Sequence, residues 1–265
     1  MHLDTNGTGK LLKIALVQSS LIWESPERNR DGLSKVIEEI SSDVDVIVLP
    51  EMFTTGFTMS PANILHSEGE RSVRWMKDHA QRKNAALVGS MVFYEAGHYY
   101  NRLWFVEPNG KSTCYDKRHT FTLAGEDKVY TAGKDRLLIH FRGFRFCPLI
   151  CYDLRFPVWA RNTEDYDLLI YVANWPEKRI DAWDALLKAR AIENMAYVVG
   201  VNRIGQDDYG HRYVGHSAVY DVLGKPLVFS QEETVLYATL NKDHIMDQRE
   251  RLKFLDDRDL FNFLV

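Results

Sequence analysis

The hydrophobic positions along the chain follow two alternating periods. Short runs of aliphatic and β-branched residues, at 12–18 and 44–49, are typical of buried strands. Between these runs, residues 28–40 repeat apolar side chains every three or four positions, which predicts an amphipathic helix. A strand, a helix and a second strand in this order predict a βαβ opening.

The same alternation continues along the rest of the chain. Two more helices are predicted at residues 72–82 and 180–195. Further strands are predicted at residues 86–93, 101–107, 137–141, 144–150, 167–173, 196–202, 217–221 and 225–229. Only three residues separate the last two runs, which favours a hairpin beside the βα units and therefore a mixed sheet.

The two ends of the chain differ from this pattern. The first residues are polar, so residues 1–11 are expected to be a flexible leader and residues 12–265 a single domain, because no Pro-, Gly- or Ser-rich linker interrupts them. Residues 247–259 carry alternating charges and predict an exposed helix. The apolar end that follows, residues 260–265, is expected to dock on a neighbouring surface.

Composition limits the classes of protein. Of the 265 residues, 45% are hydrophobic and 26% charged, which is typical of a globular chain with a sizeable core. The net charge of -4 gives no positive field for a nucleic acid. No apolar run approaches the roughly 18 residues that span a bilayer, so no membrane partner is expected. Three cysteines and no readable secretory signal favour a reducing, cytoplasmic location.

Three reactive residues stand where apolar runs stop. Glu51 follows residues 47–50, Cys151 follows residues 146–150, and Lys117 lies among other ionisable residues. Ligands of α/β sheets gather beyond the carboxyl ends of strands, where such residues would meet. Taken singly, each has a commoner explanation: an exposed loop acid, a buried structural thiol and a solvated lysine.

Together these residue types point to a cysteine hydrolase that has no histidine base. A carboxylate takes the thiol proton, and the thiolate attacks a carbonyl or nitrile carbon. A lysine ammonium then stabilises the developing oxyanion. Glutamate, lysine and cysteine are each chemically necessary for this sequence of steps.

The segments around these residues resemble a known family. Residues 49–53 (LPEMF), 115–119 (YDKRH) and 149–157 (LICYDLRFP) are similar to the three catalytic blocks of the carbon-nitrogen hydrolase (nitrilase) superfamily, in the family's order. The similarity extends from about residue 12 to the C-terminus and includes the segments 171–176, 188–194 and 215–217. Within the superfamily, the blocks look most like those of the omega-amidase branch.

The resemblance implies an α/β fold, a four-layer α-β-β-α sandwich with mixed sheets, and a homodimer. It implies Cys151 as nucleophile, Glu51 as general base and Lys117 as oxyanion stabiliser, with the backbone N–H of Tyr152 as a second donor. A second acid is expected after the lysine block, and Glu126 is the candidate.

Asp127 is the alternative to Glu126 for the second acid. The omega-amidase branch hydrolyses the terminal amide of 2-oxo-dicarboxylic acid monoamides, such as 2-oxoglutaramate and 2-oxosuccinamate, to the acid and ammonia. The reaction passes through a cysteine thioester. The partners implied are a small amide substrate and water, and the chemistry needs neither a metal nor an organic cofactor.

A substrate of this kind carries a remote carboxylate, which requires a cation or amide donors in the pocket. Arg155 is the candidate cation, and an ion pair with a structural acid such as Asp153 is its alternative. The other candidate pocket residues are Asn174, Trp175, Phe57 and Phe121, with ordinary core packing as the alternative for Trp175.

Other functions fit the sequence less well. A serine hydrolase would use Gly215-His216-Ser217, but Val219 stands where the motif needs its second glycine. A metal hydrolase is disfavoured because the nine histidines form no His-Glu-x-x-His motif. Two alternatives remain open: another carbon-nitrogen hydrolase, acting on nitriles, N-carbamoyl amino acids or other small amides, and a non-catalytic scaffold.

Overall fold

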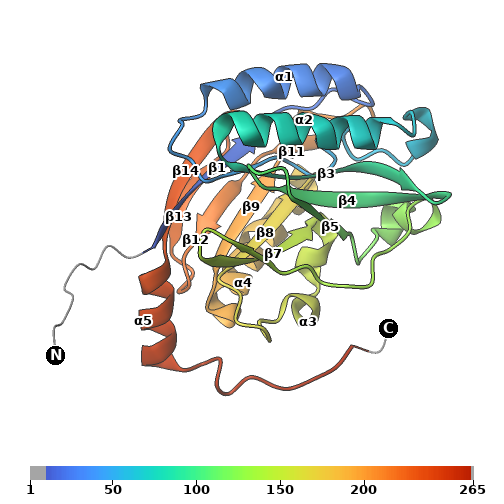
Figure 1. The fold of residues 1–265 in the computed structure, drawn as a ribbon. Coiled ribbons are helices and arrows are strands. Elements are labelled where there is room, and N and C mark those ends of the chain that lie inside the picture. The colour runs from blue at the N-terminus through green and yellow to red at the C-terminus, as the bar shows by residue number, and fades with distance from the viewer. Residues whose placement is uncertain (1–9, 264–265) are drawn as a thin grey trace.

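Two six-stranded sheets pack face to face in the computed structural model, which describes residues 10–263 (Figure 1). The first sheet has the order β14 (Thr234–Asn241), β1 (Leu11–Gln18), β2 (Val46–Val48), β3 (Ala86–Glu95), β4 (His98–Val106) and β5 (Ser112–Asp116). The second has the order β13 (Pro226–Ser230), β12 (Ser217–Tyr220), β9 (Tyr197–Asn202), β8 (Leu168–Ala173), β7 (Phe144–Ile150) and β6 (Ile139–Phe141). A separate two-stranded ribbon joins β10 (Ile204–Gln206) to β11 (Arg212–Val214).

Helices cover the outer faces of both sheets. Figure 1 shows α1 (Pro26–Glu39) and α2 (Glu68–Lys83) lying together across the first sheet, while α4 (Ile180–Asn194) packs on β9 and β12 of the second. There are two shorter helices: α3 (Pro157–Ala160) lies between β7 and β8, and α5 (Lys242–Leu252) follows β14. The layers therefore run helix, sheet, sheet, helix, and the predicted α-β-β-α sandwich is confirmed.

The side chains of β1 show how the sequence forms two hydrophobic layers. Successive side chains of a strand point to opposite faces. Ile14 and Leu16 join the core between the sheets, whereas Ala15 and Val17 join the core beneath α1 and α2. The run is apolar at nearly every position because both of its faces are buried.

Most predicted elements are present, with bounds shifted by a few residues, but the C-terminal helix was misplaced. It was predicted at residues 247–259, and α5 instead occupies Lys242–Leu252. Asn241 begins it, because its side-chain oxygen accepts a hydrogen bond from the backbone N–H of Asp243. Lys253, in the left-handed conformation with φ 56°, ends it. Alternating charge marked an exposed segment and did not locate these two caps.

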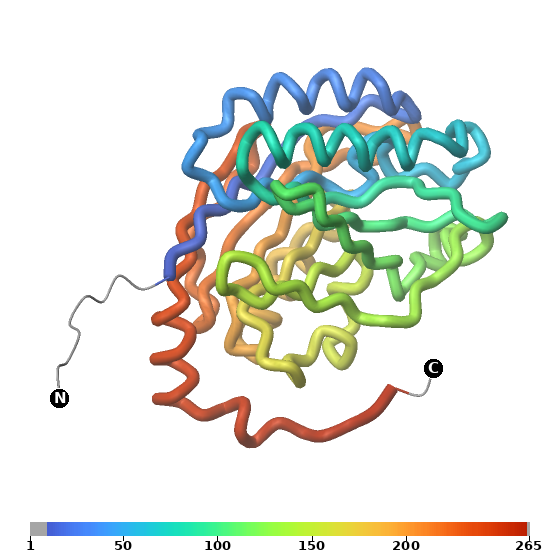
Figure 2. The backbone as a smooth tube through the Cα atoms, in the orientation of Figure 1, coloured from blue at the N-terminus to red at the C-terminus, as the bar shows by residue number. Residues whose placement is uncertain are grey.

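Four strands lie outside the predicted strand ranges: β5, β10, β11 and β14. Strand β14 runs antiparallel to β1 and pairs with it from Leu11 to Gln18, as Figure 2 shows for the blue and red-orange segments. Leu11, placed in the predicted leader, is thus the first residue of β1, and residues 1–9 of that leader lie outside the described residues. Of the apolar end, residues 264–265 also lie outside them.

The topology brings strand ends together at one edge. Strands β1, β2 and β3 are mutually parallel, and so are β7, β8 and β9. The chain leaves β2 toward Glu51, β7 toward Cys151 and β8 toward Asn174. No helix within residues 10–263 is long and apolar enough to cross a membrane.

Candidate active site

Cys151 is the first residue after β7 and begins a short 3-10 helix, Cys151–Arg155. Its φ of 43° lies in the left-handed region, which is costly for a residue with a side chain. Met52, directly after Glu51, has a similar φ of 44°, and its N–H donates to Ser90 Oγ at 2.9 Å. Both strand ends thus turn sharply, and both turns place a reactive side chain at the edge of the sheets.

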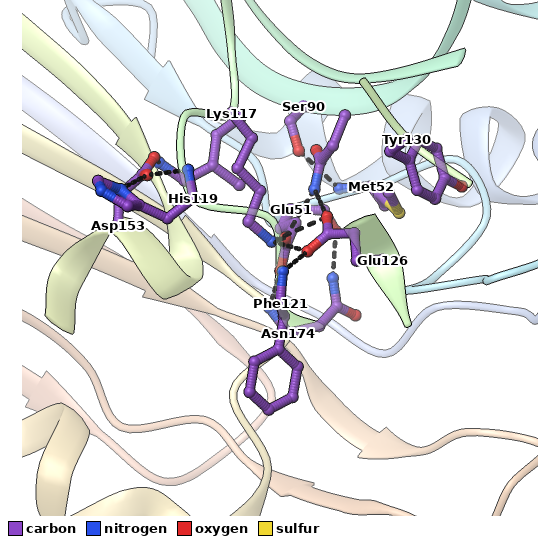
Figure 3. Close-up of polar contacts among 12 residues, drawn as sticks. Glu51, Met52, Ser90, Lys117, His119, Phe121, Glu126, Tyr130, Asp153 and Asn174 are labelled. Atoms are coloured by element: carbon purple, nitrogen blue, oxygen red, sulfur yellow. Dashed lines mark hydrogen bonds and ion pairs between the residues drawn. The ribbon is translucent and has the colours of Figure 1, made fainter. Parts of the chain in front are cut away.

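Lys117 is the centre of a buried ionic network (Figure 3). Its Nζ donates to Glu51 Oε1 at 2.9 Å. The same ammonium donates to both oxygens of Glu126, at 3.0 and 2.9 Å. The side chain of Lys117 is 1% exposed and both carboxylates are 0% exposed. The single ammonium of Lys117 therefore pairs with two carboxylates that are both shielded from water.

Two asparagines fix the orientation of Glu51. Asn101, on β4, donates from Nδ2 to Glu51 Oε1 at 2.8 Å and to Glu126 Oε1 at 3.2 Å. The backbone N–H of Asn174, at the end of β8, donates to Glu51 Oε2 at 2.8 Å. Both oxygens of Glu51 thus accept directed hydrogen bonds. Asn101 was not predicted from the sequence, because a single asparagine within a strand carries no motif.

Burial and charge act in opposite directions on the ionisable groups of this network. Burial alone would lower the pKa of Lys117, but the carboxylates of Glu126 and Glu51 outweigh it and raise that pKa. Burial raises the pKa of Glu126, and the charge of Lys117 opposes the rise. Lys117 is consequently a permanent cation at neutral pH.

The Cys151 thiol has a pKa well above its ordinary value. Burial is the main cause, the negative charge of Glu51 adds to it, and Lys117 acts in the opposite sense. The sulfur is therefore protonated at neutral pH in the free protein. A thiol in this state needs a neighbouring base before it can act as a nucleophile.

A cavity of about 410 Å³ opens beside the thiol. The candidate residues that line it are Phe57, Lys117, Phe121, Cys151, Tyr152, Arg155, Asn174 and Trp175. Glu51 and Glu126 are fully buried and contact Lys117. Other residues that were not predicted from the sequence also line the cavity: Met59, Arg179, Asp207, Tyr209, His211 and Tyr213. Four of these come from the β10–β11 ribbon and its turn, which hydrophobic patterning did not detect.

The structure resolves several of the alternatives. Asp153 does not pair with Arg155, because it accepts hydrogen bonds from Tyr115 Oη at 2.8 Å, His119 Nδ1 at 2.8 Å and the backbone N–H of Ile150 at 3.0 Å. The guanidinium of Arg155 instead lies 4.9 Å from the centroid of the Trp175 ring. Trp175 fits both interpretations, pocket lining and core packing, because it lines the cavity and belongs to the hydrophobic core.

The structure also distinguishes between the remaining candidate residues. Asp127 is exposed, whereas Glu126 contacts Lys117. The Oγ of Ser217 is buried and donates to the backbone oxygen of Asn202, so it is not presented as a nucleophile. Tyr152 lies in the first turn of its 3-10 helix, where backbone N–H groups lack intrahelical acceptors. Among the described residues, no group of three or more His, Cys, Asp or Glu side chains is arranged to hold a metal.

Comparisons with known proteins agree with this geometry. The family model described as Carbon-nitrogen hydrolase matches residues 13–250. The chain is 44% identical to omega-amidase YafV of Yersinia enterocolitica, over 96% of this chain and 99% of that protein. It is 32% identical to 2-oxoglutaramate amidase of Bacillus subtilis, over 94% and 98%.

A solved structure shows the same fold. The protein XC1258 of Xanthomonas campestris, described as a CN-hydrolase superfamily protein with an arsenic adduct in its active site, matches with a TM-score of 0.93. The two chains are 39% identical, and the match covers 96% of this chain and 99% of that one.

Proposed function

Because the chain belongs to the carbon-nitrogen hydrolase family, we propose that it hydrolyses the terminal amide of 2-oxo-dicarboxylic acid monoamides, such as 2-oxoglutaramate and 2-oxosuccinamate, to the acid and ammonia. The observation that carries the proposal is the buried contact of Lys117 with Glu51 and Glu126 beside the cavity that Cys151 lines. The omega-amidase and 2-oxoglutaramate amidase relatives support the substrate class.

Acylation is the first half of the proposed reaction. Glu51 takes the thiol proton of Cys151, and the sulfur attacks the amide carbon. Lys117 Nζ and the backbone N–H of Tyr152 stabilise the negative charge that develops on the amide oxygen. Glu51 then gives its proton to the departing nitrogen, which leaves as ammonia, and a thioester remains on Cys151.

Deacylation is the second half of the reaction and uses the same residues. Glu51 takes a proton from water, the water oxygen attacks the thioester carbon, and the carbon–sulfur bond breaks. The sulfur recovers a proton and the carboxylic acid departs. Glu126 and Asn101 act through their neighbours in this scheme: Glu126 keeps Lys117 charged and in place, and Asn101 holds the Glu51 carboxylate.

Glu51→Gln separates the charge of this residue from its role as a base. The variant should lose at least about 100-fold in amide turnover, because the amide cannot accept the thiol proton. The pKa of Cys151 should nevertheless fall, because the variant removes the negative charge that raises it. The measurement is the rate of iodoacetamide alkylation at Cys151 against pH, in a Cys114→Ala background that removes the exposed thiol. An unchanged alkylation profile together with retained turnover would contradict both roles.

The substrate class is tested with a panel of amides and related compounds. We expect ammonia release from 2-oxoglutaramate and 2-oxosuccinamate, with much lower rates on simple nitriles and N-carbamoyl amino acids. Turnover of a nitrile or carbamoyl compound alone would keep the thiol chemistry and reject the substrate class. Silence on the whole panel would favour a non-catalytic scaffold.

We propose one catalytic domain that begins with β1 at Leu11 and continues to residue 265, assembled as a homodimer and working in the cytoplasm without a nucleic-acid partner. The family resemblance supports the dimer, and the three free cysteines, Cys114, Cys147 and Cys151, suit a reducing compartment. Light scattering of the purified protein tests the dimer, since a mass near the 30.7 kDa of one chain would reject it.

A further inference from the structure

Two arginines in the cavity have no acidic partner within residues 10–263. Arg155 and Arg179 both line the cavity, and neither forms an ion pair there. Each guanidinium instead lies over an aromatic ring: Arg155 is 4.9 Å from the centroid of Trp175, and Arg179 is 5.2 Å from that of Phe121. Stacking on a ring leaves the N–H edge of a guanidinium available to an acceptor.

Asp207, in the cavity lining, and Glu177, near Arg179 in the sequence, are engaged with other residues. Asp207, which also lines the cavity, accepts from Tyr213 Oη at 2.8 Å and from the backbone N–H groups of Tyr209 and His211 at 3.0 and 2.9 Å. Glu177, two residues before Arg179, pairs with Arg212 at 3.4 Å. Within residues 10–263, neither of the two cavity guanidinium groups therefore has a carboxylate paired with it.

The backbone of Arg179 is held firmly. Its carbonyl accepts a hydrogen bond from Trp175 Nε1 at 2.7 Å, and its N–H donates to the Pro176 carbonyl at 3.0 Å. Trp175 follows directly after Asn174, whose N–H holds Glu51. The segment that orients Glu51 thus also positions Arg179, so a ligand held by Arg179 has a defined relation to the reacting groups.

We propose that Arg179, together with Arg155, binds the 2-oxo acid end of the substrate. The inference rests on the proposed function and assigns its specificity-determining residue. The remote end of a 2-oxo acid amide offers a carboxylate and a keto oxygen, both of them acceptors for guanidinium N–H groups. Lys117 is not assigned to this end, because the proposed reaction places its ammonium at the amide oxygen, and the carboxylates of Glu51 and Glu126 already balance its charge. Two guanidinium groups that lack a paired carboxylate in one cavity also favour an anionic ligand.

The test compares Arg179→Met with Lys178→Met. Lys178 is the exposed neighbour, so its variant removes the same charge from the same turn but outside the cavity. For Arg179→Met we expect kcat/KM on 2-oxoglutaramate to fall about 10- to 150-fold, mostly through KM. Turnover of pentanamide, which has neither the carboxylate nor the keto group, should stay unchanged. Lys178→Met should match the unaltered protein on both substrates.

Two results would overturn the inference. One is an equal loss on 2-oxoglutaramate and pentanamide, which indicates a general disturbance of the site. The other is no loss on either substrate. Arg179→Gln, with thermal unfolding of each variant, shows whether a loss arises from misfolding. Arg179→Lys should recover only part of the activity, because an ammonium lacks the planar fork of donors.

A binding measurement separates this inference from the proposed function. Calorimetry with 2-oxoglutarate, the acid product, reports on the anion subsite without turnover. If the unaltered protein does not hydrolyse 2-oxoglutaramate, the proposed function fails. Weaker 2-oxoglutarate binding by Arg179→Met but not by Lys178→Met would still support the anion subsite, and equal binding by all three proteins would reject it.

Discussion

Replacing Cys151 with alanine is expected to lower kcat for amide hydrolysis by about 10⁴- to 10⁶-fold, the range seen when the nucleophile of a covalent hydrolase is removed. No other thiol is placed to substitute for it. Cys147 is fully buried within β7, and Cys114 is exposed on β5 and does not line the cavity. The loss should fall on the chemical step, because Arg155 and Arg179 remain in place to bind substrate.

The measurement is ammonia release from 2-oxoglutaramate, with Cys114→Ala as the matched control. Both variants remove one thiol, and only the first removes it from the cavity. The control should keep full activity. Mass spectrometry of the unaltered enzyme, quenched during turnover, should show the acyl group on Cys151. Activity of Cys151→Ala above about one hundredth of the normal rate would reject the proposed nucleophile.

Replacing Lys117 with methionine should destabilise the fold as well as abolish turnover. The variant leaves the carboxylates of Glu51 and Glu126 buried without their shared cation. Removing one partner of a buried ion pair typically lowers the free energy of unfolding by about 3–5 kcal/mol. Turnover is lost because the oxyanion loses its charged donor.

The pH dependence of this destabilisation has a definite sign. Burial already raises the pKa of Glu126, and loss of the Lys117 charge raises it further. In the variant the folded state then binds more protons than the unfolded state above the ordinary glutamate pKa, so the free energy of unfolding falls as pH rises. The difference from the unaltered protein should therefore be smaller at pH 5 than at pH 8.

Urea unfolding at the two pH values tests this expectation, with Lys128→Met as the matched control. Lys128 is exposed in the same segment as Glu126 and makes no contact with the buried network. Adding Glu126→Gln to Lys117→Met should restore part of the lost stability, because it removes one of the two stranded charges. A pH-independent difference would show that Lys117 contributes packing and not charge compensation.

The sequence contains enough local information to predict most of the secondary structure. Runs such as residues 144–150 are buried on both faces and read as strands from their composition alone. The bounds of α5 depend on a cap at Asn241 and a left-handed residue at Lys253, which hydrophobic pattern does not report. The layering of two sheets came from the resemblance to the family, because local patterns do not specify which sheets pack together.

The residues of the candidate site were likewise predictable only in part. Glu51, Lys117 and Cys151 stand in recognisable blocks, and the structure places Glu51 and Lys117 in contact beside the cavity that Cys151 lines. Asn101 and Arg179 stand in no block that chemistry alone would single out. Their roles depend on partners distant in sequence. Asn101 donates a hydrogen bond to Glu51, 50 positions away, and Arg179 lies over the ring of Phe121. Such residues emerge only when the chain is folded.

The pairing of β1 with β14 bears on how the chain folds during synthesis. Strand β1 emerges from the ribosome first, but its antiparallel partner follows more than 200 residues later. Until β14 is made, one edge of the apolar β1 has no partner and is exposed to other nascent chains. Long-range pairing of this kind makes folding slow. The first sheet is therefore completed last, and the unpaired edge of β1 is open to aggregation until residue 241 is translated.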